Sequence, residues 1–385
     1  MSDRGHMRVM LCHPSAELYG SDRMALEAVV GLRDRGAHVT VVLPVDGPLR
    51  GELQAAGADV LVRDVPVLRK SALKPSGFAR LVFDLVRRGP RMVRVIRRVR
   101  PDLVYVNTIV QPWWALASRL LRKRVVFHVR EAEVDPPALV RRALLSPLRL
   151  AHSVIANSQF TARQIFLDCP SVRTRTSVIY NGKDWSAYAV RHEPSPEGTF
   201  RILYLGRLSP RKGTDVAVRA VARMRRDGTD VRLTLAGAVF PGYEWYEAEL
   251  RDLCRELSLG SDVVTFTGFV ADAPPLFSTA DALVVPSRAE PFGTVAAEGL
   301  AAGVPVIVSD VQGLVEIVGD GREGLVVPAD DPDELASRLE MLRTDDILRE
   351  RLIDQGRRSV SERFSREQYR AQVAAEIFRV AGHEE

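Results

Sequence analysis

The sequence has few cysteines and no long apolar run. Its three cysteines, Cys12, Cys169 and Cys254, lie far apart without a CxxC pair, which excludes a disulfide framework and a cysteine-rich zinc site. Such a small number of widely separated cysteines favours a reducing compartment. The longest notable uncharged stretch, residues 103–118, is broken by polar residues and a proline, whereas a spanning helix needs about 20 mostly apolar residues. We therefore expect no membrane span.

The chain also lacks an apolar export signal at its start. Residues 1–7 are largely polar, and Gly5-His6-Met7 resembles a cloning remnant in front of a native Met7. We expect a cytoplasmic protein, with the inner face of the plasma membrane as a further candidate location.

What is present is typical of a globular protein with two domains. The 385 residues are 46% apolar and 27% charged, with 27 glycines and 23 prolines. The charge is divided unevenly, because residues 1–190 hold 30 basic and 16 acidic side chains while residues 191–385 hold 24 and 33. Opposite net charge in the two halves predicts two domains with different partners.

Basic residues concentrate at positions 69–100, which hold eleven Lys and Arg and one acid, Asp84. Apolar residues recur there at helical spacing, and Gly89-Pro90 is expected to interrupt them, which predicts a pair of helices. Two interpretations stay open: solvated surface helices, or a face that meets anionic lipid headgroups. No aromatic residue separates the arginines at positions 87–100, so a nucleic-acid partner, which needs stacking rings, is not expected.

Short apolar, β-branched runs alternate with helical patterns along the chain, which predicts βαβ units and parallel sheets. We expect an α/β protein with two Rossmann-like, doubly wound domains facing a cleft. The Pro/Ser/Gly-rich residues 191–199 predict a linker between an N-terminal domain (1–190) and a C-terminal domain (200–364), and a last helix within 365–385 is a candidate to pack back on the N-terminal domain. The predicted strands are 8–13, 38–43, 60–65, 103–107, 125–129, 154–156, 177–180, 202–205, 233–236, 263–267, 282–285, 306–309 and 325–327.

Two short motifs are interpreted as structural. Gly319-Asp-Gly321-Arg-Glu-Gly324 matches GxGxxG, but it follows a helical run and precedes a strand, the reverse of the order that a dinucleotide site needs. Asp331-Pro-Asp333 is the only D-x-D, and it lies in a polar turn that opens a helix, where aspartate is an ordinary cap. We therefore expect neither a metal site nor a bound cofactor.

The strongest polar constellation is Glu290-Pro-Phe-Gly293-Thr294, with Glu298 inside the helix that follows. It comes directly after the strand predicted at 282–285. The helix that Gly293-Thr294 opens offers N–H groups and a positive dipole end, which suit phosphate or sugar oxygens. The two carboxylates suit the two ends of an elongated polar ligand better than an acid/base pair acting on one atom.

A second cluster, Gly206-Arg207-Leu-Ser-Pro-Arg211-Lys212-Gly213, also joins a strand to a helix. Arginine supplies a bidentate fork and lysine a point charge, so Arg207 and Lys212 are suited to neutralise a pyrophosphate leaving group. His128 ends another strand, where ligands of α/β sheets bind. A hydrogen-bonded core histidine is the alternative interpretation there.

Residues 200–328 resemble the donor-binding domain of retaining glycosyltransferases of the GT-B fold, family GT4. The pieces that carry the resemblance are GRLSPRKG, LTLAG, TFTGFV, ALVVPSRAEPFGTVAAEGLAAGVPVIVSD and GLVVPADDPDELA, in this order. The first half is similar in fewer places, namely FHVRE, ANSQFTAR and VIYNGKD. The resemblance therefore covers the C-terminal half most specifically.

The resemblance implies roles for individual residues. Arg207 and Lys212 would bind the donor diphosphate and stabilise its departing charge. Glu290 would approach the sugar hydroxyls, Glu298 would accept from the ribose hydroxyls, and His128 would lie near the sugar and the acceptor. We take His128, Arg207, Lys212 and Glu290 as the candidate catalytic residues.

The same resemblance implies further donor contacts. Backbone N–H groups of Phe292, Gly293 and Thr294 would hold the sugar or the distal phosphate. The loop of Gly268, Phe269 and Val270 would border the base, and Gly20 and Ser21 would meet the phosphate or the acceptor.

Two departures from the family pattern stand out. The N-terminal loop 18–22 has one glycine, Gly20, where the family has two, and residues 311–316 replace a Gly-Gly-x-Pro-Glu turn. The first departure affects the expected contact of Gly20 with the phosphate or the acceptor, and the second affects the packing behind the donor.

The activity implied is retaining, metal-independent hexosyl transfer from a nucleotide-diphosphate sugar, UDP- or GDP-linked. The departing phosphate would accept the proton of the acceptor hydroxyl in a front-face transfer. The basic N-terminal half favours a membrane-linked or anionic glycan or glycolipid acceptor, as in cell envelope polysaccharide biosynthesis. The alternatives are a sugar-nucleotide epimerase or phosphorylase of the same fold, and a non-catalytic peripheral membrane protein.

Overall fold

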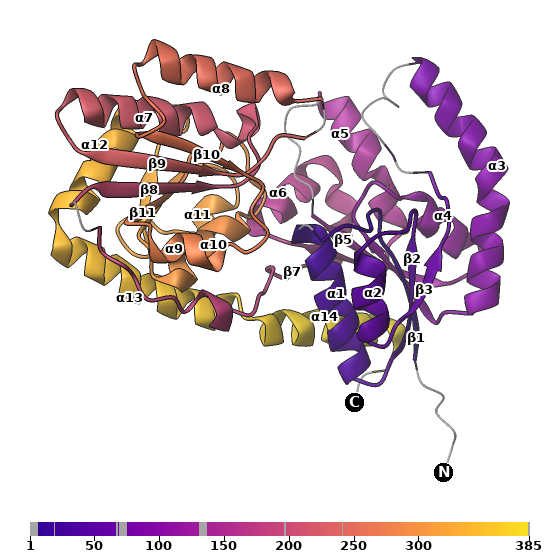
Figure 1. The fold of residues 1–385 in the computed structure, drawn as a ribbon. Helices are drawn as coiled ribbons and strands as arrows, with labels where there is room; N and C mark the ends of the chain where they lie inside the picture. The colour runs from indigo at the N-terminus through magenta and orange to yellow at the C-terminus, as the bar shows by residue number, and fades with distance from the viewer. Residues whose placement is uncertain are drawn as a thin grey trace. The chain divides into compact units, whose positions relative to one another are not determined.

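The structure, a computed structural model, describes residues 7–18, 20–66, 68, 75–130, 137–195, 198–240 and 242–383. Side chains at 75–82, 85 and 86 are not described. The predicted cloning remnant before Met7, Tyr19 of the N-terminal loop, residues 69–74 of the basic stretch and Glu131 of the FHVRE piece lie outside the described residues. The chain forms two compact units (Figure 1): unit 1 is Met1–Gly182 with Arg366–Glu385, and unit 2 is Lys183–Ser365.

Unit 1 is built on a seven-stranded sheet in the order β3-β2-β1-β4-β5-β6-β7, in which every pairing is parallel. Its strands are β1 (Arg8–Cys12), β2 (His38–Leu43), β3 (Asp59–Val62), β4 (Leu103–Asn107), β5 (Arg124–Val129), β6 (Ser153–Ala156) and β7 (Thr176–Val178). Its helices are α1 (Gly20–Asp34), α2 (Leu49–Ala55), α3 (Pro75–Val99), α4 (Trp113–Leu120), α5 (Ala138–Leu145), α6 (Gln159–Asp168) and α14 (Arg366–Ala381), with 3-10 turns η2 (Ser146–Leu150) and η3 (Pro170–Arg175). Helices cover both faces of the sheet, so its strands are almost continuously apolar.

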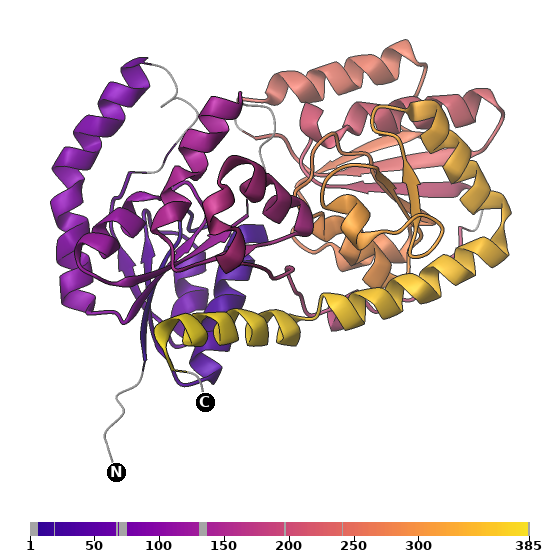
Figure 2. The ribbon, with the colours of Figure 1, turned by 180° about the vertical axis from the view of Figure 1, so that it is seen from behind.

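The last helix, α14, packs within unit 1. Tyr369, Val373 and Ile377 are buried in the core that α1 and α2 form with one face of the sheet. The Tyr369 hydroxyl donates to the carbonyl of Met24 on α1 at 3.0 Å, and Figures 1 and 2 show α14 crossing α1. The C-terminal segment thus completes one of the two helical layers of unit 1.

Unit 2 repeats the design with a six-stranded parallel sheet in the order β10-β9-β8-β11-β12-β13. Its strands are β8 (Phe200–Leu205), β9 (Val231–Ala236), β10 (Val264–Gly268), β11 (Ala282–Val285), β12 (Val306–Ser309) and β13 (Leu325–Val327). Its helices are α7 (Thr214–Arg226), α8 (Glu244–Glu256), α9 (Pro274–Ser278), α10 (Thr294–Ala302), α11 (Leu314–Ile317), α12 (Pro332–Thr344) and α13 (Asp346–Arg363), with 3-10 turns η4 (Ser186–Tyr188) and η5 (Pro210–Lys212). The helices α7, α8 and α12 share one core with the sheet, and α10 packs on the opposite face.

The parallel, doubly wound sheets confirm the predicted fold class, and all thirteen predicted strands are present. Among the described residues, no helix is long and apolar enough to cross a bilayer. Several predicted strand boundaries were wrong by one to three residues. The β3 strand, for example, ends at Val62, three residues before the predicted end, and Val65 beyond it is buried in the core.

The predicted break at Gly89-Pro90 was also wrong, because α3 continues through it as one helix from Pro75 to Val99. Proline removes one helical hydrogen bond and crowds the preceding turn, at a cost of about 3 kcal/mol. Met92 and Ile96, just after the proline, are buried in the core, and this packing holds the second half of the helix in line.

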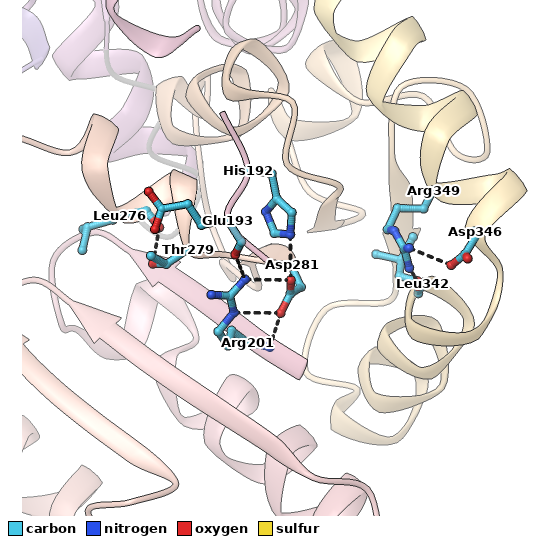
Figure 3. Close-up of polar contacts among 9 residues, drawn as sticks. All are labelled: His192, Glu193, Arg201, Leu276, Thr279, Asp281, Leu342, Asp346 and Arg349. Atoms are coloured by element: carbon cyan, nitrogen blue, oxygen red, sulfur yellow. Dashed lines mark hydrogen bonds and ion pairs between the residues drawn. The ribbon is translucent and has the colours of Figure 1, made fainter. Parts of the chain in front are cut away.

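The predicted linker begins as a segment anchored to unit 2. Figure 3 shows Asp281 accepting from the guanidinium of Arg201 at 3.1 Å and pairing with His192 at 3.2 Å. Arg201 also donates to the backbone carbonyl of Glu193. Residues 189–195 have no regular secondary structure, and these contacts fix their path at the start of β8.

Candidate functional site

The predicted donor residues of unit 2 lie on loops that follow three of its strands. Residues 206–213 join β8 to α7, residues 286–293 join β11 to α10, and Phe269 and Val270 follow β10. Since β8 and β11 are neighbours in a parallel sheet, their loops leave the same edge. The structure therefore brings the basic cluster and the Glu290 loop together.

The two loops are joined through backbone contacts. The N–H of Arg288 donates to the carbonyl of Arg211 at 2.8 Å, and the Arg211 side chain donates to the carbonyl of Ala289 at 2.7 Å. Gly213 has a left-handed φ of +65°, and a Cβ there would overlap the carbonyl oxygen of Pro286. Only glycine lets the chain turn into α7 this close to the second loop.

Lys212 and Glu290 form an ion pair between these loops. Their side chains are 20% and 13% exposed, so both charges are largely removed from water. Burial alone would raise the pKa of Glu290, but the Lys212 ammonium, the nearby Arg211 and a hydrogen bond from the Phe292 N–H together hold that pKa below its usual value. Glu290 is therefore a carboxylate at neutral pH, fixed beside a cation at the start of α10.

A second ion pair braces the β11 loop from α7. Arg288 donates to both oxygens of Asp215 at 2.8 Å, and the Tyr246 hydroxyl donates to Asp215 at 2.9 Å. Burial would raise the pKa of Asp215, but the Arg288 guanidinium outweighs it and lowers that pKa. This pair was not predicted from the sequence, although Arg288 lies inside one of the segments that carry the resemblance.

The loop that leads into α10 is supported by the turn at residues 311–316, which departs from the pattern of the family that the sequence resembles. Gly293 has φ +97° and precedes Thr294, the first residue of α10, as predicted. Gly313 donates its N–H to the carbonyl of Glu290 at 3.0 Å, and a Cβ at Gly313 would overlap the carbonyl of Pro291. Residues 311–316 thus retain one glycine where the close approach requires it.

Glu298 lies one turn inside α10 and pairs with a residue that sequence analysis gave no role. Lys183 places its ammonium 2.6 Å from Glu298 Oε1 and 4.4 Å from the centre of the Tyr188 ring. The Glu298 residue is only 8% exposed. The two predicted carboxylates thus have different lysine partners, which agrees with separate roles along one ligand.

Arg207 and the β10 loop border the same edge of the sheet. The Arg207 guanidinium lies over the Phe240 ring at 3.7 Å, and the Arg207 carbonyl accepts from the Tyr204 hydroxyl at 2.8 Å. Gly268 has φ +70°, and Phe269 is 70% exposed. The roles of Arg207 at the diphosphate and of 268–270 at the base stay predictions.

In unit 1, Gly20 and Ser21 form the start of α1, next to a buried polar network. Asp22, 1% exposed, lies 2.6 Å from His13 Nε2, and the Asn107 amide nitrogen lies 2.8 Å from His13 Nδ1. Arg130 Nε donates to Asn107 Oδ1 at 2.8 Å. Because an arginine only donates, this bond assigns the Asn107 amide as a donor to His13, and His13 then donates to Asp22.

His128 is fully buried within unit 1. Its Nδ1 lies 2.6 Å from the Tyr105 hydroxyl and 3.3 Å from Arg130, whose guanidinium also donates to Tyr369 at 2.7 Å. Its Nε2 is buried without a hydrogen-bond partner. This environment matches the alternative of a core histidine, and a direct catalytic role for His128 stays a prediction.

We expect the stability of the protein to fall as pH drops from about 7.5 to about 5.5. Burial lowers the pKa of His13 despite the neighbouring Asp22, and burial together with Arg130 lowers the pKa of His128. The unfolded chain therefore takes up protons first, so this stability is present above the ordinary histidine pKa and lost below it. Denaturant midpoints at the two pH values measure the effect, and His13→Asn and His128→Gln should each flatten the dependence.

The network residues share a signal, the end of a parallel strand, that was used in the N-terminal half only for His128. His13 follows β1, Asn107 ends β4 and Arg130 follows β5, so all lie at the carboxyl edge of the unit 1 sheet. If every polar residue at the carboxyl end of a predicted strand had been taken as a candidate, these residues would have been found.

The two motifs interpreted as structural are used as predicted. Asp331 caps α12 by accepting from the N–H of Glu334 at 2.9 Å, and Asp333 lies 3.7 Å from Arg223. The glycines at 319–324 form the turn between α11 and β13. In the part of the chain that the structure describes, no group of three or more His, Cys, Asp or Glu side chains is arranged to hold a metal ion.

Comparisons with known proteins agree with this geometry. Residues 19–186 match the family described as Glycosyltransferase Family 4, and residues 189–359 match Glycosyl transferases group 1. Spore coat protein SA of Bacillus subtilis is 30% identical over 372 residues, which span 90% of this chain and 91% of that protein. D-inositol 3-phosphate glycosyltransferase of Nocardia farcinica is 33% identical over 373 residues, spanning 89% and 80%.

Two further curated relatives are matched over about half of their own length, 50% and 53%. Among solved structures, the crystal structure of HepE of Anabaena in complex with UDP and glucose has a TM-score of 0.80 and 26% sequence identity, and covers 96% of this chain and 99% of that one. A second HepE crystal structure, in complex with UDP-glucose, has a TM-score of 0.79.

Proposed function

The chain belongs to family GT4, the group 1 glycosyltransferases of the GT-B fold, and from this premise we propose that it is a retaining hexosyltransferase that uses a UDP- or GDP-linked sugar. The observation that carries the proposal is the Lys212–Glu290 pair at the start of α10. It sets a cation for phosphate and a carboxylate for sugar hydroxyls side by side at a helix N-terminus. The binding of UDP and glucose by HepE supports a nucleotide-sugar donor.

Lys212 and Arg207 stabilise the negative charge that develops on the diphosphate as its bond to the sugar breaks. An ammonium has three N–H donors, so Lys212 can hold Glu290 and donate to a phosphate oxygen at once. Arg207 adds a second cation from the same loop. In a front-face transfer the departing phosphate takes the proton of the acceptor hydroxyl, and the two cations stabilise the phosphate without a metal ion.

A panel of UDP-, GDP-, ADP- and dTDP-sugars tests this proposal by thermal shift and product analysis. One nucleotide sugar is expected to raise the unfolding temperature and to give a glycosylated product with the anomeric configuration of the donor. Because Arg207 and Lys212 replace a divalent ion, EDTA should leave the turnover unchanged. An inverted product, an isomerised sugar, or activity lost with EDTA and restored by Mg²⁺ would contradict the proposed mechanism.

The acceptor that we propose is a membrane-linked or anionic glycan or glycolipid precursor, reached from the cytoplasmic face of the membrane. Arg87, Arg91, Arg94 and Arg98 of α3 are exposed, and their spacing of four, three and four residues puts them on one helix face, here called the arginine face. Arg88 is not part of it, because it pairs with Asp64 at 2.9 Å. On the neighbouring helix α4, two exposed leucines, Leu116 and Leu120, add apolar area.

We expect the protein to sediment with anionic but not with neutral vesicles at low salt. Each arginine near an anionic bilayer contributes about 1 kcal/mol, and salt screens this over about 8–10 Å. Glutamine at the four positions of the arginine face should abolish sedimentation. A matched variant with glutamine at four exposed arginines of unit 2, namely Arg225, Arg226, Arg351 and Arg358, should retain it. Equal binding to neutral vesicles would instead favour solvated helices and a soluble acceptor.

A further inference from the structure

Lys183 is held in a fixed position inside unit 2. Its backbone N–H donates to the carbonyl of Phe364 at 3.1 Å, and it forms a β-bridge with Ser365. The Trp185 indole donates to the same Phe364 carbonyl at 2.8 Å. Backbone contacts before α14 and a buried aromatic cluster thus fix the base of the Lys183 side chain.

The head of this lysine is equally constrained. The ammonium donates to the hydroxyl of Tyr188 and lies over its ring, while it pairs with Glu298 Oε1. Tyr188 is 4% exposed and packs between Trp185 and Phe277, with ring centres 5.9 and 5.8 Å away. Tyr188 therefore fixes where the ammonium lies, and the ammonium in turn holds the Glu298 carboxylate.

The carboxylate needs this partner. Glu298 lies in an alanine-rich helix whose neighbouring residues Ala296, Ala297 and Leu300 are buried. A charge in such surroundings is costly unless it is paired. Since a carboxylate has about four acceptor positions, pairing one oxygen with Lys183 leaves acceptor capacity for two ligand hydroxyls.

We propose that Lys183 is the positioning residue that makes the donor site selective for a ribose over a 2′-deoxyribose. The inference rests on the proposed function, in which Glu298 accepts from the ribose hydroxyls. Lys183 does not touch the nucleotide. It holds Glu298 in the one orientation from which a bidentate contact to neighbouring hydroxyls is made, and removing the 2′-hydroxyl leaves a buried acceptor unpaired.

Isothermal titration calorimetry of the full chain with UDP and with 2′-deoxy-UDP tests the proposal. If the nucleotide-sugar panel shows that the protein prefers GDP-sugars, GDP and 2′-deoxy-GDP are used instead. The wild-type protein should bind the ribonucleotide on the order of 10- to 100-fold more tightly, the range for a hydrogen bond to a charged group. Lys183→Met keeps the apolar stem, and it should reduce this ratio to about threefold or less while it leaves the Kd of the deoxynucleotide nearly unchanged. Lys183→Arg should restore part of the ratio.

The controls separate this role from a general loss of structure. Lys123→Met, which removes a lysine of unit 1, should keep the full ratio, and Lys183→Met combined with Glu298→Gln should discriminate no less than Glu298→Gln alone. If Lys183→Met weakens the binding of both nucleotides equally, or changes neither, the ratio of the two Kd values stays the same. That result would overturn the inference about Lys183 but not the proposed function. A wild-type protein that binds no nucleotide of the panel would overturn the proposed function, and the inference with it.

Discussion

Alanine at Arg207 or at Lys212 is expected to lower kcat for sugar transfer by about 10²–10³-fold while the protein stays folded. The physical reason is that, in the proposed mechanism, each cation stabilises negative charge that develops on the departing diphosphate. Arg207 is exposed and rests on Phe240, so its removal leaves no cavity. Turnover and donor Kd, measured separately, should show that kcat falls more than binding does.

Lys212 carries a second effect, which its controls must isolate. Removing it deprives Glu290 of the main partner that lowers its pKa, so the pKa of Glu290 should rise. The acidic limb of the pH profile of turnover should then move to higher pH in Lys212→Ala. Lys212→Arg keeps the charge and should recover part of the rate. Arg219→Ala, which removes an exposed cation of α7, should be normal. Near-normal turnover in both Arg207→Ala and Lys212→Ala would remove the diphosphate assignment.

The sheets were predictable because their signal is local. Strands buried on both faces must be apolar throughout, as in β4, where all five residues are buried, so each strand is visible in its own few residues. The loops of the proposed donor site were predictable for the same reason, since each follows a recognisable strand. The continuity of α3 was not, because the local penalty of Pro90 is outweighed by core contacts of Met92 and Ile96 that no local pattern reveals.

The pairings inside the sites depend on contacts between distant parts of the chain. Lys183 and Glu298 are 115 residues apart, and Arg130 and Tyr369 are 239 apart. A lysine in a loop has no periodicity that would mark its partner. The same holds for His128, since a strand-end histidine has the same sequence signal whether it faces a ligand or, as here, packs between Tyr105 and Tyr369.

The two glycines that bracket α7 give a matched test of how the donor loops are built. Gly213 and Gly228 both have a left-handed φ, +65° and +89°. A Cβ at Gly228 would meet no atom within 4 Å, whereas a Cβ at Gly213 would overlap the backbone carbonyl of Pro286. Alanine at either position incurs the cost of the left-handed conformation, about 1–2 kcal/mol, but only at Gly213 must the β11 loop also move.

Gly213→Ala is therefore expected to lose about 1–3 kcal/mol more free energy of unfolding than Gly228→Ala, because overpacking against a backbone is added to the conformational cost. Gly213 follows Lys212 directly, so a displaced loop also separates the Lys212 ammonium from Glu290. Donor affinity and turnover should consequently fall at least tenfold in Gly213→Ala and stay close to wild type in Gly228→Ala. Urea unfolding and nucleotide titration measure the two effects. Equal losses in both variants would mean that the contact between the β8 and β11 loops does not set the geometry of the site.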